Sequence, residues 1–307
     1  MNYPFKRKSA FHFERLAQEE KDSHQTIHAS SLENRDYETY NVFFYFPVRI
    51  TLWRLRAFNA GVGLLHLIQF AALFGIGLWK QVPLNLVNHI QLSGPTEPLN
   101  IDTQFLPFLP LIVSAMFSLM SAVGHFMLAA NYKNCYGKIM DEKYNYIRWM
   151  EYSISSSIML LNINVISGVT DLFANICSLG CNVGMILFGD VSDRFRIIEG
   201  KRKEAFVAFF YGTIIGLFPW VCIFASYGQV SVHQGTVPWF VHAIILSIFF
   251  QFSSFGVNQL FVLLGKVPFM KGEYTFAHGE INFALLSITC KSSLAWQLFG
   301  AFISRLL

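Results

Sequence analysis

Long apolar runs alternate with short polar connections along most of the chain, from about residue 52 to about residue 305. A helix that crosses a membrane needs roughly 20 mostly apolar residues, and seven runs are that long. They cover about 52–79, 107–132, 145–167, 169–189, 204–228, 236–265 and 277–305. The pattern therefore predicts an all-α membrane protein built as a bundle of seven transmembrane helices.

Two segments outside these runs predict smaller features. Residues 1–50 mix both charges and indicate a soluble tail, whose last part, 41–50, has the aromatic residues of a segment lying at the membrane interface. The helical domain would then cover 51–307. The connection 80–106 combines strand-like residues with a Gly-Pro turn at 94–95, which indicates a small β-hairpin lid, with an irregular loop as the alternative.

Composition supports the membrane class and excludes others. Hydrophobic residues make up 53% of the chain and charged residues 14%, whereas ordinary globular chains carry about 25% charged residues. Such a sequence cannot provide a water-facing shell, and it is too apolar for a disordered chain. The net charge of +4 gives no reason to expect a nucleic-acid partner. Its five cysteines are scattered, so we expect neither a disulfide framework nor a metal site.

The distribution of basic residues predicts the orientation. If seven helices alternate, 20 of the 23 Lys and Arg residues lie on the side of the N-terminus, and Lys80 and Arg305 lie on the other. Because cytoplasmic loops are enriched in Lys and Arg, this split predicts a cytoplasmic N-terminus and an extracellular C-terminus.

One basic residue, Lys291, falls inside the seventh run, where a bare ammonium group is costly. Either a carboxylate partner or conversion to a Schiff base with an aldehyde would resolve this cost. Glu151 in the third run is the candidate partner, and Arg148, three residues earlier on the same helix face, would help to keep it ionised. A purely structural ion pair is the alternative.

Other polar residues also lie in apolar surroundings. His66 and Gln69 are one turn apart in the first run, and His125 is in the second. They could form a hydrated polar pocket or a proton relay, or they could be packed histidines with satisfied hydrogen bonds. Two histidines alone make a poor zinc site.

Together these residues resemble the heliorhodopsins, a retinal-binding seven-helix family, over roughly 52–305. The third helix carries Arg148-Trp149-x-Glu151-Tyr152, and the seventh carries Ser287-x-x-x-Lys291 followed by Trp296. The other matching positions are His66-x-x-Gln69, His125, Pro219-Trp220 and Asn258-Gln259. The cytoplasmic N-terminus expected from the charges agrees with this family.

The resemblance implies that Lys291 binds all-trans retinal as a protonated Schiff base, with Glu151 as its counterion. Ser287 would stand where pumping rhodopsins usually have a second carboxylate. The implied pocket residues are Tyr152, Ser156, Met159, Asn182, Met185, Ile186, Phe252, Gln259 and Trp296. Asn145 and Arg148 would lie together toward the cytoplasmic side, and His66, Gln69 and His125 would form the family's buried polar pocket. The resemblance also implies a homodimer in the lipid bilayer.

Two functions follow as hypotheses. In the first, the chain is a light sensor that reports through its tail or its basic fourth-to-fifth loop to a cytoplasmic partner. In the second, it is a light-gated passive proton or cation conductance, with Glu204 and Glu280 on the inner side of the path; a solvated helix end is the alternative for Glu280. We expect no enzyme, because the sequence has no nucleophile elbow, no HExxH motif and no paired carboxylates inside the runs.

Overall fold

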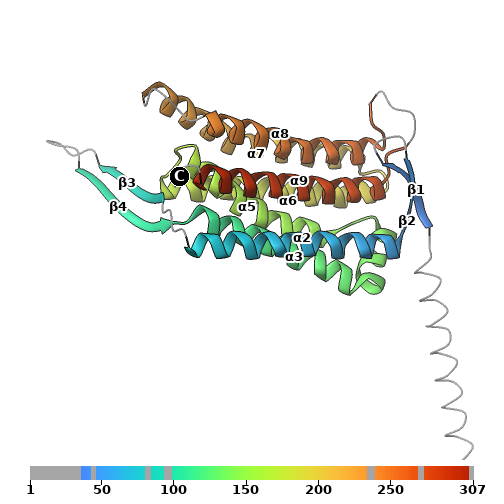
Figure 1. Ribbon diagram of the computed structural model, residues 1–307. Helices are drawn as coiled ribbons and strands as arrows, with labels where there is room; N and C mark the ends of the chain where they lie inside the picture. The colour runs from blue at the N-terminus through green and yellow to red at the C-terminus, as the bar shows by residue number, and fades with distance from the viewer. Residues whose placement is uncertain are drawn as a thin grey trace, which may run out of the picture.

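The computed structural model describes residues 36–42, 46–79, 84–92, 99–233, 239–268 and 273–303. Long helices lie side by side along one common direction, which confirms the predicted helical bundle (Figure 1). They are α2 (Leu52–Trp79), α3 (Pro110–Ala130), α5 (Tyr146–Ile166), α6 (Leu172–Ile197), α7 (Arg202–His233), α8 (Trp239–Leu264) and α9 (Phe276–Ile303). The fourth apolar run was expected to end at 189, but its helix continues to Ile197. The added residues include Asp190, Asp193, Arg194 and Arg196, which are polar but still helical, so the apolar pattern did not include them.

Within the described residues, α2, α3, α6, α7 and α8 are long and apolar enough to cross a membrane. With 21 and 28 residues, α5 and α9 also have a membrane-spanning length. Both carry charged residues: Arg148 and Glu151 on α5, Glu280 and Lys291 on α9. These two helices therefore hold the candidate lysine and its candidate carboxylate partner.

Each long helix packs against the next, and α9 also contacts α2 and α3, which closes the bundle. Side-chain caps begin two of the helices: the carboxamide of Asn145 accepts the backbone N–H of Arg148, and Asp171 accepts that of Ala174. Gly168 and Gly200 have positive φ angles of 94° and 76°, which permit the short turns after α5 and α6.

A hairpin lies at each end of the bundle (Figure 1). Strands β1 (Asp36–Val42) and β2 (Phe46–Thr51) pair antiparallel ahead of α2, and residues 1–35 of the expected tail lie outside the described residues. Strands β3 (Leu84–Leu92) and β4 (Leu99–Phe108) pair antiparallel between α2 and α3. We call the two ends of the bundle the β1–β2 end and the β3–β4 end. A π-helical turn, η1 (Tyr132–Tyr136), and the short α4 (Gly137–Glu142) join α3 to α5 at the β1–β2 end.

Two large apolar clusters hold the helices together. The larger one includes Phe117, Ile163 and Ile248, all at most 1% exposed. The other includes Leu52 and Leu128 and lies nearer the β1–β2 end. Buried polar residues occur on several helices, and the charged ones among them are Arg148, Asp193, Glu280 and Lys291 within the described part of the chain.

Candidate functional site

Lys291 of α9 lies in the centre of the bundle with its side chain 4% exposed. Its Nζ is 2.7 Å from Oε1 of Glu151 and donates to Oγ of Ser121, 2.5 Å away. Ser121 Oγ in turn donates to the same Glu151 oxygen at 2.7 Å. The ring centroid of Tyr152 lies 5.3 Å from the ammonium nitrogen. The structure thus brings the predicted lysine and carboxylate together across α5 and α9, and it adds a serine from α3.

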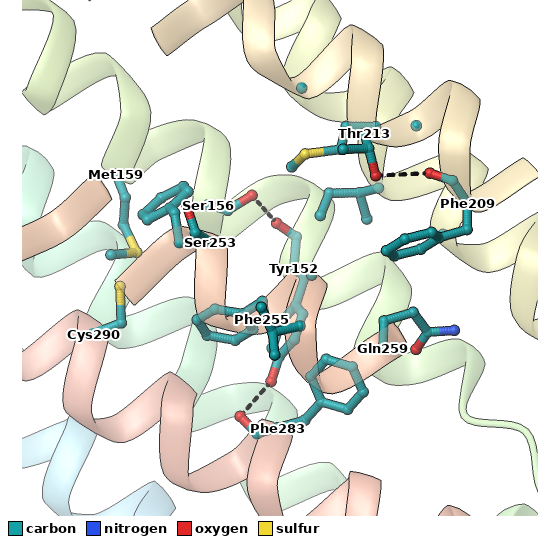
Figure 2. A pocket seen from close by; sticks show the side chains of 18 of the residues that line it. Tyr152, Ser156, Met159, Phe209, Thr213, Ser253, Phe255, Gln259, Phe283 and Cys290 are labelled. Carbon is teal, nitrogen blue, oxygen red and sulfur yellow. Dashed lines mark hydrogen bonds between the residues drawn. The ribbon is translucent and has the colours of Figure 1, made fainter. Parts of the chain in front are cut away.

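A cavity of about 410 Å³ opens beside Lys291, between α5, α6, α7, α8 and α9. This is within the range of about 300–1,000 Å³ that is typical of small-molecule sites. Most of its lining is aromatic or aliphatic. Figure 2 shows the side chains of Tyr152, Phe255 and Phe283 close to one another in the centre of the view. The hydroxyl of Tyr152 donates to the backbone oxygen of Phe283 at 2.8 Å, which fixes the ring against α9. A buried amine at the wall of an apolar cavity can hold an apolar aldehyde of suitable length.

Most residues expected in the pocket line this cavity. They are Tyr152, Ser156, Met159, Met185, Ile186, Phe252, Gln259 and Lys291 itself. Asn182 lies just behind the wall, where its amide donates to the hydroxyls of Ser156 and Ser157 at 2.8 and 3.0 Å. Ser287 lies one turn before Lys291 and is fully buried.

Trp296 was expected in the pocket, but the structure places it elsewhere. It is 44% exposed, packs edge-on against Phe299, and is not part of the cavity lining. Its position on α9, five residues after Lys291, turns it away from the cavity. Trp220 of α7 lines the cavity with Phe249 and Phe252, with ring centroids 5.1 and 5.6 Å from its own.

The predicted histidine pocket lies on the other side of the Lys291–Glu151 pair. The rings of His66 and His125 stack with centroids 5.9 Å apart. His66 shares a hydrogen bond with Gln69 at 3.2 Å, and His125 shares one with Asn59 at 2.8 Å. Gln69 also donates to Ser292 at 2.6 Å, next to Lys291 in the sequence. The three predicted residues therefore form one group against α9, in which a hydrogen bond joins His66 to Gln69 and ring stacking joins His66 to His125.

Arg148 is the centre of a charged network toward the β1–β2 end. Its guanidinium pairs with Asp193 of α6 at 3.2 Å and with Glu280 of α9. Asn145 donates to the second oxygen of Glu280 at 2.6 Å. Arg148 was expected to help to keep Glu151 ionised, but its described ion pairs are made with Asp193 and Glu280.

The two carboxylates proposed for an inner path differ in their exposure to solvent. Glu280 is 5% exposed, so it is a buried ion-pair partner and not a solvated helix end. Glu204 has a side chain 41% exposed and pairs with Lys201 at 2.8 Å on the surface. It lies in the first turn of α7, and no described hydrogen bond or ion pair joins it to Arg148, Asp193 or Glu280.

A second, smaller cavity of about 40 Å³ joins the two polar groups. Its lining includes Glu151 and His125 on one side and Arg148, Asn145 and Glu280 on the other. A space of this size can hold an ordered water molecule, which needs two to four polar partners. The geometry thus provides a polar connection from Glu151 to the Arg148 network.

Sequence reasoning missed two functional contacts. Ser121 is one of several serines on α3, and nothing in its spacing distinguishes it from a small packing residue. Asp193 is fully buried and accepts from Arg148, from the indole N–H of Trp149 at 3.3 Å and from Arg196 at 2.8 Å. It lies beyond the predicted apolar run, next to Arg194 and Arg196, so nothing in the sequence indicated that it is buried.

Comparisons with known proteins agree with this architecture. The transmembrane domain of Salpingoeca rosetta rhodopsin phosphodiesterase is 13% identical, with a TM-score of 0.55, over 81% of this chain and 84% of that one. A thermophilic rhodopsin from Rubrobacter xylanophilus is 14% identical, with a TM-score of 0.52, over 81% of this chain and 93% of that one. At these identities the likeness shows a shared rhodopsin fold. No curated protein matches the sequence.

The sequence profile of the heliorhodopsins matches residues 55–303, which include all of the site residues described above. This span, together with the rhodopsin-like fold and the apolar helices, makes the chain an integral, multi-pass membrane protein. The chain belongs to the heliorhodopsin family, whose members are retinal photoreceptors.

Proposed function

We propose that the chain is a light sensor in which Lys291 carries all-trans retinal as a protonated Schiff base and Glu151 is the counterion. The observation that supports this most is the position of the Lys291 amine, at the wall of an apolar cavity with a carboxylate 2.7 Å behind it. The cavity's size and its aromatic lining suit a long hydrocarbon group. When bound, retinal supplies the absorption of visible light and the isomerisation that follows.

The residues around Lys291 are suited to holding one positive charge in the membrane. A buried cation needs a paired and hydrogen-bonded anion, and Glu151 provides the negative charge. Ser121 contacts both partners and so fixes their relative orientation. Ser287, one turn before Lys291 on α9, is neutral and adds no charge. This arrangement supports a site with one carboxylate.

A signalling role is supported by the link from the cavity to the β1–β2 end, which we propose is the cytoplasmic end. Trp149 lines the cavity and donates to Asp193, so a change in cavity shape acts on a buried carboxylate. Asp193 binds Arg196, whose guanidinium donates at 2.5 Å to the backbone oxygen of Lys143 in the turn before α5. The charged network therefore connects the chromophore site to a surface turn.

A passive conductance is the second hypothesis, and the small cavity next to Glu151 favours a proton path in this half of the bundle. Among the described residues, however, buried polar groups toward the β3–β4 end are neutral, such as Asn162, Asn164 and Ser114. A sensor needs no ionisable path through that half, so the charge distribution favours the sensor. The homodimer and the cytoplasmic partner remain predictions.

The test is the visible spectrum of the Lys291→Ala variant. Purified full-length protein, with retinal added, is expected to show a visible absorption band, and Lys291→Ala is expected to show none because no other buried amine lines the cavity among the described residues. Lys266→Ala, at an exposed lysine, is the matched control and should retain the band. Circular dichroism checks that the variants are folded. A visible band in folded Lys291→Ala protein would overturn the proposal.

A further inference from the structure

Gln259 of α8 is an unusual member of the cavity lining. The residue is 3% exposed, and both its amide nitrogen and its amide oxygen lack a hydrogen-bond partner among the described residues. Most other polar groups of the lining are satisfied locally: Thr213 donates to Phe209, Ser253 to Phe249 and Ser156 to Tyr152. The carboxamide of Gln259 is therefore left with an unused donor and an unused acceptor inside a ligand cavity.

The position of Gln259 in the cavity indicates which part of a bound ligand would contact its carboxamide. Figure 2 shows Gln259 and Phe209 on one side of the pocket and Cys290 and Met159 on the other. Cys290 precedes Lys291 directly in α9. A chromophore attached to Lys291 therefore starts on the Cys290 side, and its far end, the ring, extends toward Gln259.

A hydrocarbon ring cannot satisfy this amide. A buried polar group without a partner costs about 1–3 kcal/mol, and the neighbouring side chains Phe209, Phe255 and Leu260 offer no polar atom. A hydroxyl group on the ring, in contrast, can donate to Oε1 or accept from Nε2. A ketone could only accept, so the paired donor and acceptor of a carboxamide match a hydroxyl better.

We propose that Gln259 forms a hydroxyl subsite at the far end of the cavity, so that the chain binds a ring-hydroxylated retinal in preference to retinal itself. This inference rests on the proposed attachment of the chromophore to Lys291. It concerns which aldehyde is taken and leaves the roles of Lys291 and Glu151 unchanged.

The experiment is a competition between two aldehydes for the full-length apoprotein. Equal amounts of all-trans retinal and all-trans 3-hydroxyretinal are added, and the bound chromophores are extracted and quantified by chromatography. One hydrogen bond gained by a buried amide is worth about 1 kcal/mol, so we expect wild-type protein to hold about fivefold more of the hydroxylated aldehyde. Gln259→Leu should hold the two in nearly equal amounts.

Gln251→Leu is the matched control. Gln251 is also on α8 and also has a buried amide oxygen without a described partner, but it does not line the cavity, so the preference should persist. Equal binding by wild-type protein would overturn the inference and would mean that water satisfies Gln259. A preference that persists in Gln259→Leu, or in Gln259→Met as a second variant, would also overturn it. Failure of wild-type protein to bind either aldehyde would instead overturn the proposed function, and this inference with it.

Discussion

At the scale of single residues, the site depends on three polar groups: an ammonium, a carboxylate and a hydroxyl. Lys291, Glu151 and Ser121 are mutually within 2.7 Å, and each comes from a different helix. The sequence revealed the first two because an ionisable residue within an apolar run is costly and therefore rare. It could not reveal Ser121, because serines in membrane helices are common and bond their own backbone as readily as another helix.

Removing the charge of Glu151 should change the colour of the chromophore. A carboxylate beside the nitrogen stabilises the positive charge there in the ground state, while light spreads this charge along the chain of double bonds. Glu151→Gln is therefore expected to shift the absorption maximum to longer wavelength, as measured on purified protein at neutral pH. Glu280→Gln is the control, because that carboxylate pairs with Arg148 and should give a smaller shift. An unchanged maximum in Glu151→Gln would remove it as the counterion.

At the scale of helices, the contact between α5 and α6 fixes the position of one side chain that lines the cavity. Trp149 lies against Gly189, where an added Cβ atom would come within 2.5 Å of the indole ring. The same indole lines the cavity and donates to Asp193. The helices themselves were predictable from their apolar runs, but this close approach was not, because it depends on which faces of two helices meet.

Gly189→Ala should therefore destabilise the protein through displacement of Trp149. Forcing an extra methyl group into a packed contact typically costs about 1–3 kcal/mol. We expect a lower thermal midpoint for the loss of helical signal, followed by circular dichroism in detergent. Gly180→Ala, on the same helix, has nothing within 4 Å of the added atom and should leave the midpoint unchanged or slightly raised. Equal midpoints for the two variants would show that the contact can relax without cost.

At the scale of the whole molecule, the alternation of apolar and polar segments was enough to predict the helical bundle and the approximate limits of its helices. It could not distinguish Glu280, which is buried, from Glu204, which is on the surface. Both lie near a helix start, and Glu280 can be buried because Arg148 of α5 and the capping residue Asn145 contact its two oxygens. Burial of a charge is set by partners distant in the sequence, so the sequence of one helix alone does not determine it.

The measurement that tests the central claim most directly is the identification of the lysine that carries the chromophore. Full-length protein with bound retinal is reduced with borohydride under illumination, which converts a Schiff base to a stable secondary amine. It is then digested and analysed by mass spectrometry. We predict the added retinyl mass on the peptide that contains Lys291. Its appearance on a different lysine, or an unmodified Lys291 in coloured and fully reduced protein, would contradict the account.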